Sequence, residues 1–267
     1  MSLYEKILGK NATVGVIGIG YVGLPLAVEK ARAGFKVVGF DIQQKRVDMV
    51  NRGENYIGDV DDDELKELVN SGKLRATTNF DELANCDVVS ICVPTPLDQF
   101  KQPDLSYIVN SANEVKKRLR KNQLIVLEST TYPGTTEEVV LPILEETGLK
   151  VGKDFYLAFS PERVDPGNPR YKTRNTPKVV GGVTPDCTKH AVALYESVLE
   201  AGVFPVSSPR AAEMTKILEN TFRLVNIALV QEMTKVAEKM GVNIWEVIEA
   251  ASTKPFGYMP FYPGPGI

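Results

Sequence analysis

Three glycines near the amino terminus are spaced to bind a dinucleotide. Gly18, Gly20 and Gly23 form a GxGxxG motif that follows a short apolar run and precedes a helical pattern. In that context the first glycine makes a tight turn, the second lets the backbone approach a pyrophosphate, and the third allows close helix–strand packing. Asp41 ends the next apolar run, where a carboxylate accepts from ribose hydroxyls and repels a 2′-phosphate. The pattern predicts NAD over NADP, although the nearby Arg46 keeps NADP open.

Polar loops follow three further strand candidates, at residues 93–96 (VPTP), 128–134 (ESTTYPG) and 160–163 (SPER). In a parallel sheet all three would emerge at the carboxyl edge, where ligands bind. Lys216 and Asn220 lie four residues apart in a helical stretch and therefore share a face. Each feature also has an ordinary structural explanation: proline-fixed turns, a solvated or arginine-paired glutamate, and a surface pair on a helix.

Histidine and cysteine usage excludes several kinds of chemistry. His190 is the only histidine among 267 residues, so a His-based triad or a histidine metal site is hard to build. We expect it on the exposed face of a surface helix. Cys86, Cys92 and Cys187 show no CxxC spacing, so neither a disulfide framework nor a metal site is predicted. Cys92 lies in a strand candidate and is interpreted as a small buried hydrophobic residue.

Charge and hydropathy exclude two classes of partner. The net charge of −3 gives no overall attraction to nucleic acid or to an anionic membrane. No apolar run reaches the roughly 18 residues of a transmembrane helix. The first residues lack the basic, apolar and small-residue regions of a signal peptide. We therefore expect a cytoplasmic protein that binds neither nucleic acid nor membrane.

Strand and helix patterns alternate over residues 1–206, which predicts a doubly wound, Rossmann-type parallel sheet with helices on both faces. The strand candidates are residues 13–19, 35–41, 87–93, 124–128, 155–159, 178–181 and 203–206. The helix candidates are residues 24–33, 43–51, 65–70, 106–120, 135–146 and 185–200. An acidic run at 59–64 precedes one of these helices. We interpret it as a helix cap rather than a metal site.

Residues 207–267 form a second, helical domain in this interpretation. Apolar residues at three-and-four spacing predict one long helix, with Ser208 as its cap and Gly241 as its stop. Asn243 is placed to cap a second helix over residues 244–252. The apolar stripe of the long helix is too large for one thin domain to bury, so we expect it to pack on another surface.

Taken together, the motifs resemble the UDP-glucose/GDP-mannose dehydrogenase family from about residue 11 to the last residue. The motifs that carry the resemblance are GIGYVGLP at 18–25, PTP at 94–96, Ser129-Thr130, SPERV at 160–164, KILEN at 216–220 and PGPG at 263–266. Two stretches, PERVDPG at 161–167 and FYPGPGI at 261–267, look most like the branch that acts on UDP-N-acetylglucosamine.

The resemblance implies a role for each of these positions. Thr130 would order a catalytic water near the nicotinamide, and Glu162 would position substrate or water. Lys216 would stabilise the developing oxyanion. Asn220 would hydrogen-bond the same water or oxygen. The NAD-binding positions would be Gly18, Gly20, Tyr21, Val22, Gly23, Asp41, Arg46 and Thr95.

The family oxidises the C6 alcohol of a nucleotide sugar to a carboxylate with two NAD, and its long central helix forms a homodimer interface. UDP-N-acetylglucosamine is the favoured substrate here, with UDP-N-acetylmannosamine and UDP-glucose as alternatives. The family's catalytic cysteine lies beyond Ile267, which predicts a fragment that binds NAD but cannot complete the oxidation. Two other functions stay open: an NAD-binding and dimerisation module without catalysis, and a 3-hydroxyacid dehydrogenase.

Overall fold

The computed structural model describes residues 1–165, 167–168 and 170–264 of the chain. The chain divides into two compact units, Met1–Met214 and Thr215–Ile267. Part of the PGPG motif at 263–266 and the end of the chain at Ile267 lie outside the described residues, as does one position of the 161–167 motif. In the part of the chain that the structure describes, the helices lack the length and hydrophobicity of a membrane-spanning segment.

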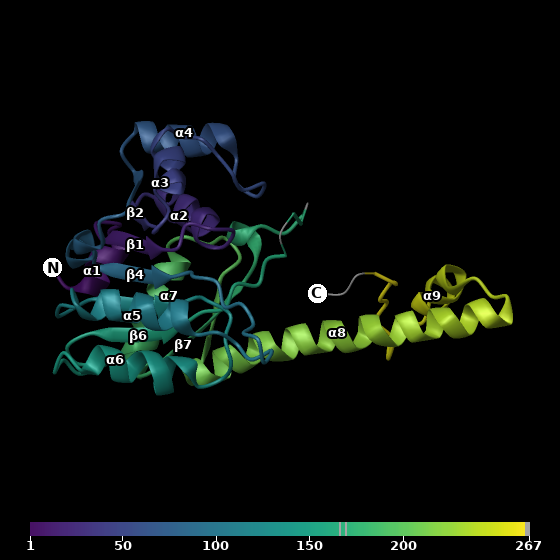
Figure 1. The fold of residues 1–267 in the computed structure, drawn as a ribbon. Coiled ribbons are helices and arrows are strands. Elements are labelled where there is room, and N and C mark those ends of the chain that lie inside the picture. Colours follow the sequence, from purple (N-terminus) through teal and green to yellow (C-terminus); the bar gives the residue numbers. More distant parts are fainter. Residues whose placement is uncertain (166, 169, 265–267) are drawn as a thin grey trace. The chain divides into compact units, whose positions relative to one another are not determined.

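An eight-stranded sheet forms the centre of the first unit, in the order β3-β2-β1-β4-β5-β6-β7-β8 (Figure 1). Its strands are β1 (Thr13–Ile17), β2 (Lys36–Phe40), β3 (Leu74–Thr77), β4 (Val88–Ile91), β5 (Leu124–Leu127), β6 (Tyr156–Phe159), β7 (Lys178–Gly182) and β8 (Val203–Val206). Strands β2 and β3 follow β1 on one side of it, and the chain then crosses to the other side, where β4 pairs with β1. The β1/β4 boundary is therefore the topological switch point, beside which ligands bind in such sheets.

The predicted parallel sheet is confirmed except at one pair, where β7 runs antiparallel to β6. All other neighbouring strands are parallel. Parallel neighbours need a crossover connection, usually through a helix. The segment between Phe159 and Lys178 contains only one short 3-10 turn, η3 (Thr173–Asn175), among its described residues, so the chain returns in the opposite direction.

Helices cover both faces of the sheet, as predicted. Alternate residues of each strand face opposite sides, because the side-chain period of a strand is two. In β5, Leu124 and Val126 join one hydrophobic cluster while Ile125 and Leu127 join the other. The helices that pack against the first cluster are α1 (Leu3–Leu8), α2 (Gly23–Arg32), α3 (Gln44–Asn51), α4 (Asp62–Asn70) and α7 (Pro185–Glu196). Those that pack against the second are α5 (Ser106–Lys116), α6 (Leu141–Glu145) and the first turn of α8 (Pro209–Met240).

The acidic run before α4 contributes a helix cap, as predicted. The Asp61 side chain accepts a hydrogen bond from the Glu64 N–H, and three acidic residues occupy the first helical turn. There they interact favourably with the positive end of the helix dipole.

Three local predictions need correction. The sequence pattern does not predict helix α1, which spans only six residues, or strand β3, where the exposed Arg75 interrupts the apolar run. The helix predicted over 135–146 consists of a π-helical turn (Thr136–Val140) followed by α6. His190 is buried rather than exposed: it is only 7% accessible and its ring stacks on Tyr156 with the ring centroids 3.8 Å apart. Helix α7 turns this face toward α1 and β6, which cover the ring.

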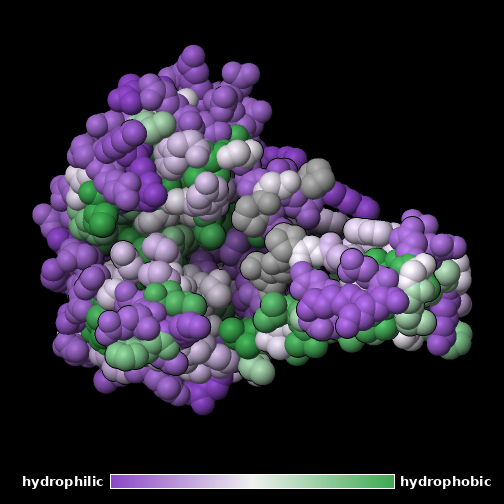
Figure 2. All heavy atoms as spheres, turned by 45° about the vertical axis from the view of Figure 1, so that its right-hand side comes forward, coloured by the Kyte–Doolittle hydropathy of each residue, from purple (hydrophilic) through white to green (hydrophobic). Residues whose placement is uncertain are grey.

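The second unit consists of most of α8 (Pro209–Met240) and of α9 (Ile244–Ser252). Asn243 caps α9 as predicted, because its side chain accepts from the Trp245 N–H. Ile244 and Ile248 of α9 pack on Ala237 and Val230 of α8. The rest of the α8 surface carries many exposed apolar side chains, which gather along this unit in Figure 2.

Candidate functional site

The glycine-rich loop joins β1 to α2 at the carboxyl edge of the sheet, next to the switch point. Gly18 has a φ of +85°, and a Cβ there would lie 2.7 Å from the Cys92 carbonyl oxygen. A Cβ at Gly23 would lie 1.8 Å from the Gly18 carbonyl oxygen, so the loop itself requires this glycine. At Gly20 a Cβ would meet no protein atom within 4 Å. The fold therefore requires two of the glycines, whereas Gly20 leaves the backbone open to a ligand.

Asp41 follows β2 directly and is almost fully buried beside this loop. Its Oδ2 accepts from the Ile19 N–H at 3.2 Å, and its Oδ1 accepts from the Gln43 N–H at 2.9 Å. The Arg46 guanidinium lies 3.4 Å from Oδ2. The carboxylate is thus fixed by backbone donors on both sides, and Oδ1, which accepts from Gln43 alone, keeps a lone pair for a further donor.

The polar loops after β4 and β5 are joined to each other. The Thr95 hydroxyl donates to the Thr130 carbonyl oxygen at 2.6 Å. The Ser129 hydroxyl oxygen accepts from the Val93 N–H at 3.0 Å. These two bonds hold the predicted residues Thr95 and Thr130 side by side at the carboxyl edge, with Thr130 exposed.

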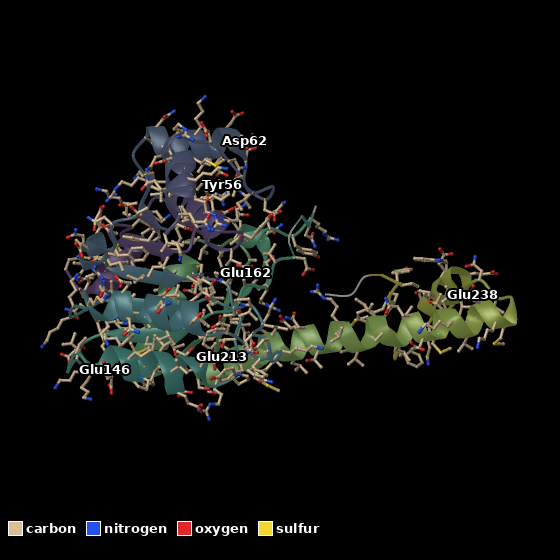
Figure 3. The ribbon with its side chains drawn as sticks, in the orientation of Figure 1. Tyr56, Asp62, Glu146, Glu162, Glu213 and Glu238 are labelled. Carbon is tan, nitrogen blue, oxygen red and sulfur yellow. The ribbon has the colours of Figure 1, made fainter. Side chains whose placement is uncertain are left out.

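Glu162 lies in the loop after β6, on the same side of the sheet (Figure 3). Its Oε1 accepts from the N–H groups of Arg163 and Val164 at 2.9 and 2.8 Å. Its Oε2 lies 3.7 Å from the Lys178 ammonium. The loop's own backbone and one buried lysine therefore orient this carboxylate.

Lys178 belongs to a buried charge cluster that the sequence did not reveal. The Glu128 carboxylate, at the end of β5, lies 2.7 Å from Lys178 and 3.5 Å from Lys30 of α2. Lys30 also donates to the Ser90 hydroxyl at 2.7 Å. The ring of Tyr195 lies 5.1 Å from the Lys178 ammonium and 5.6 Å from that of Lys30. A lysine among apolar helix residues was the only available signal, and it is equally typical of a surface position.

Electrostatics in this cluster favour an ionised Glu128. Burial alone would raise the pKa of the Glu128 carboxyl, but the positive charges of Lys178 and Lys30 outweigh burial and lower that pKa to about 2. Burial also lowers the pKa of Lys30, whereas for Lys178 the attraction of Glu128 and Glu162 exceeds the effect of burial and raises the pKa. Burial raises the pKa of the Cys92 thiol well above its ordinary value. Cys92 is therefore inert as a nucleophile.

Glu213, near the start of α8, is another buried group that the sequence pattern does not reveal (Figure 3). Its carboxylate accepts from the Gly134 N–H at 2.5 Å, from the Thr136 N–H at 2.9 Å and from the Thr136 hydroxyl at 2.7 Å. It thereby holds the segment that follows the Ser129-Thr130 loop. A charged residue at an apolar position of the helical period was the available signal.

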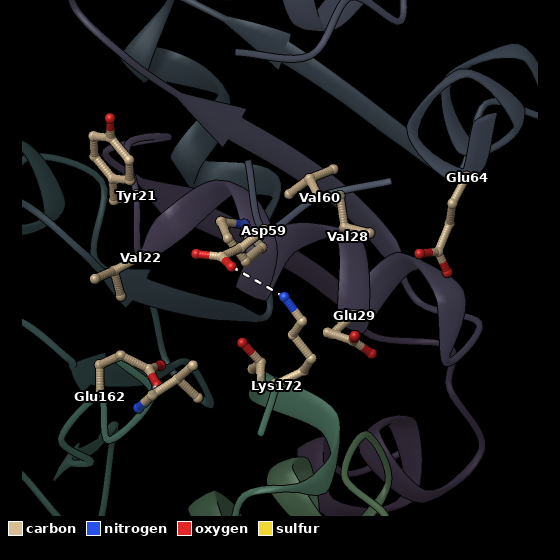
Figure 4. Close-up of a pocket in the computed structure, with 12 residues that line it drawn as sticks. Tyr21, Val22, Val28, Glu29, Asp59, Val60, Glu64, Glu162 and Lys172 are labelled. Carbon is tan, nitrogen blue, oxygen red and sulfur yellow. Dashed lines mark hydrogen bonds and ion pairs between the residues drawn. The ribbon is translucent and has the colours of Figure 1, made fainter. Parts of the chain in front are cut away.

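A pocket lies between the glycine-rich loop and the loop that carries Glu162 (Figure 4). Tyr21 and Val22 line it from the first loop and Glu162 from the second. Across the pocket, Lys172 and Asp59 form an ion pair at 3.1 Å. Two residues predicted for the cofactor, Tyr21 and Val22, and one predicted for the active site, Glu162, therefore border one space within the first unit, whereas Gly20 and Asp41 do not line it.

Lys216 and Asn220 lie on α8 in the second unit, one turn apart and partly buried. The described residues contain no cluster of three or more histidine, cysteine or acidic side chains placed to hold a metal ion.

Comparison with known proteins matches both units to one family. The NAD binding domain of the UDP-glucose/GDP-mannose dehydrogenase family matches residues 12–199, and its central domain matches residues 210–267. UDP-N-acetyl-D-glucosamine 6-dehydrogenase from Pseudomonas aeruginosa is 41% identical over 96% of this chain and 60% of its own length. UDP-N-acetyl-D-mannosamine dehydrogenase from Pyrococcus horikoshii is 40% identical over 91% of this chain and 58% of its own length.

The solved structure titled as the UDP-D-ManNAc dehydrogenase from Pyrococcus horikoshii superposes with a TM-score of 0.89 at 39% identity. The superposition covers 96% of this chain and 60% of the chain in that structure. The chain thus spans about 60% of the length of the relatives that it matches.

Proposed function

The chain belongs to the UDP-glucose/GDP-mannose dehydrogenase family, and we propose that it carries the NAD site and part of the active site of a UDP-sugar 6-dehydrogenase. The reaction oxidises the C6 alcohol of the sugar to the uronic acid in two hydride transfers. The observation that carries the proposal is the shared pocket, which the glycine-rich loop and Glu162 both line.

The residues at the switch point fit NAD. A Cβ at Gly20 would occupy the open side of the loop, where a pyrophosphate needs to approach the backbone. Asp41 presents a fixed carboxylate for the ribose hydroxyls at the end of β2. Tyr21, Val22, Arg46 and Thr95 complete the proposed cofactor site. NAD supplies the hydride acceptor when it is bound.

We assign the substrate chemistry to four side chains. Thr130 and Glu162 would order a water and the sugar at the carboxyl edge, where Thr95 and Lys178 hold them in place. Lys216 would stabilise negative charge developing on the C6 oxygen, and Asn220 would hydrogen-bond the same oxygen or water. All four roles come from the family resemblance. The hydrogen bonds that fix the loops of Thr130 and Glu162 support the roles of these two residues.

UDP-N-acetylglucosamine is the proposed substrate. A relative of 41% identity is named for that sugar, and the motifs at 161–167 and 261–267 resemble the same branch. UDP-N-acetylmannosamine is the first alternative, because a relative of 40% identity is named for it. UDP-glucose is the second. A homodimer through α8 is part of the proposal, and its support is the exposed apolar stripe of that helix.

Turnover by the complete gene product tests this function. We expect NADH formation with UDP-N-acetylglucosamine, two NADH per uronic acid, and a higher kcat/KM than with the other two sugars. Lys216→Ala should lower kcat strongly while NAD binding is retained. Unchanged turnover in Lys216→Ala would contradict the assigned chemistry. If the protein binds NAD but turns over none of the three sugars, the alternative of an NAD-binding and dimerisation module without catalysis would be favoured.

A further inference from the structure

Tyr56 contacts the glycine-rich loop from a segment that the sequence motifs do not include. It lies between α3 and α4 (Figure 3), and its hydroxyl donates to the Ile19 carbonyl oxygen at 2.6 Å. Ile19 stands between Gly18 and Gly20. The Ile19 N–H donates to Asp41. Two side chains from different elements therefore hold both backbone polar groups of one loop residue.

The bond from Tyr56 fixes the peptide plane between Ile19 and Gly20. In a trans peptide the N–H points opposite to the C=O of the same plane. Because the Ile19 carbonyl points to Tyr56, the Gly20 N–H points away from it. Within the described residues, no acceptor is found for this N–H, and a Cβ at Gly20 would have no neighbour within 4 Å. The donor is thus presented on the open side of the loop.

Tyr56 is held firmly enough to fix this plane. The Asn55 side chain orders the turn, since its Oδ1 accepts from the Ile57 N–H at 2.8 Å and its Nδ2 donates to the Val60 carbonyl at 2.7 Å. Ile57 and Val60 are both buried in the hydrophobic core. Burial and the nearby Asp41 carboxylate raise the pKa of the Tyr56 hydroxyl, despite the opposing charge of Arg46, so the hydroxyl stays a donor.

We infer that Tyr56 is a positioning residue for dinucleotide binding, which orients the Gly20 N–H toward the pyrophosphate by holding the Ile19 carbonyl. The inference rests on the NAD site of the proposed function. It adds a residue outside the GxGxxG motif, and it assigns the effect of that residue to the diphosphate rather than to the adenosine end of the ligand.

Calorimetric titration of this chain with NAD, ADP and adenosine tests the inference, with ligand-observed NMR for the weakest ligand. Tyr56→Phe removes one hydroxyl and should raise the Kd of NAD and of ADP by about threefold to tenfold, the range expected for one lost hydrogen bond. The Kd of adenosine should stay within twofold of the wild-type value. Tyr156→Phe is the matched control, since Tyr156 is a partly buried tyrosine at the opposite, amino end of β6.

Three results would overturn the inference: equal NAD binding by wild type and Tyr56→Phe, an equal loss for NAD and adenosine, or an equal loss in Tyr156→Phe. Failure of the wild-type chain to bind NAD would instead contradict the NAD site itself. A second measurement does not depend on the variant. The amide resonance of Gly20 in the wild-type chain should shift on addition of ADP and not on addition of adenosine, and a Gly20 resonance that ADP leaves in place would also overturn the inference.

Discussion

The same substitution, glycine to alanine, should reduce the stability of the fold at Gly23 and the affinity for NAD at Gly20. A Cβ at Gly23 would lie 1.8 Å from the Gly18 carbonyl, so the loop and α2 must move apart. We expect Gly23→Ala to lower the free energy of unfolding by about 1–3 kcal/mol, as overpacked sites do. Gly20→Ala meets no protein atom and should unfold like the wild type. Its Kd for NAD should rise at least about tenfold, or about 1.4 kcal/mol.

Thermal unfolding and calorimetric NAD titration of the two variants check this contrast. Each variant serves as the control for the other, because both add one methyl group to the same loop. A destabilised Gly20→Ala, or a Gly20→Ala chain that binds NAD as tightly as the wild type, would contradict the assignment of Gly20 to ligand approach.

Residues with a local pattern could be predicted from the sequence, whereas residues that act across the fold could not. The three glycines and Asp41 are recognisable because turn chemistry and strand ends fix their spacing. Glu213 and Tyr56 escaped notice because their partners lie 77 and 37 positions away along the chain. Only the tertiary structure shows that each holds a loop of the candidate site.

At the scale of elements, the buried charges join α2, the end of β5 and β7. Glu128→Gln should lower the free energy of unfolding by about 3–5 kcal/mol, because it removes the partner that two buried ammonium groups share. Denaturant unfolding measures the loss. Glu146→Gln is the matched control, since Glu146 forms an exposed ion pair with Lys116. Such pairs contribute about 0–1 kcal/mol. Equal effects of the two substitutions would contradict a structural role for the cluster.

The same cluster predicts a pH dependence of stability. The pKa of Glu128 is about 2 in the folded chain and near its ordinary value of 4.5 in the unfolded chain. A carboxyl whose pKa is lower in the folded than in the unfolded chain stabilises the fold. This contribution is complete at a pH above the pKa of the unfolded chain and is lost as the pH falls through the pKa of the folded chain. The free energy of unfolding should therefore decrease between about pH 4.5 and pH 2. This decrease should be smaller in Glu128→Gln, and an identical pH profile would contradict the ionised state of Glu128.

The alternation of strands and helices predicts the direction of most strands but not that of β7. Alternating strands and helices predicted most of the sheet, because a helical crossover forces parallel pairing. Between β6 and β7 the sequence shows no helix, so the direction of β7 could not be predicted. The antiparallel return brings Lys178 at the start of β7 beneath the loop after β6, where it reaches both Glu128 and Glu162. The site geometry therefore depends on β7, whose direction the alternation of strands and helices does not predict.

At the scale of the whole molecule, the second unit has more apolar surface than it covers. One stripe of α8 consists of seven exposed side chains, Leu218, Phe222, Val225, Leu229, Met233, Val236 and Met240. Their spacing of three and four residues places them on one face about 33 Å long, at 1.5 Å per residue. Helix α9 packs on Val230 and Ala237, which belong to a different face. In the second unit by itself most of this stripe stays in water, which is unfavourable for a patch of this size.

We therefore predict that the chain is a dimer at micromolar concentration and that this stripe forms the interface, since two copies can bury it symmetrically. Leu229→Glu combined with Met233→Glu places two charges in that interface and should give a monomer in sedimentation equilibrium, with the far-ultraviolet circular dichroism unchanged. Glu238→Lys, an exposed change on the opposite face of α8, is the control and should remain dimeric. A monomeric wild-type chain would contradict the assignment. A double variant that still dimerises would contradict it as well, because the two changed side chains lie in the middle of the stripe.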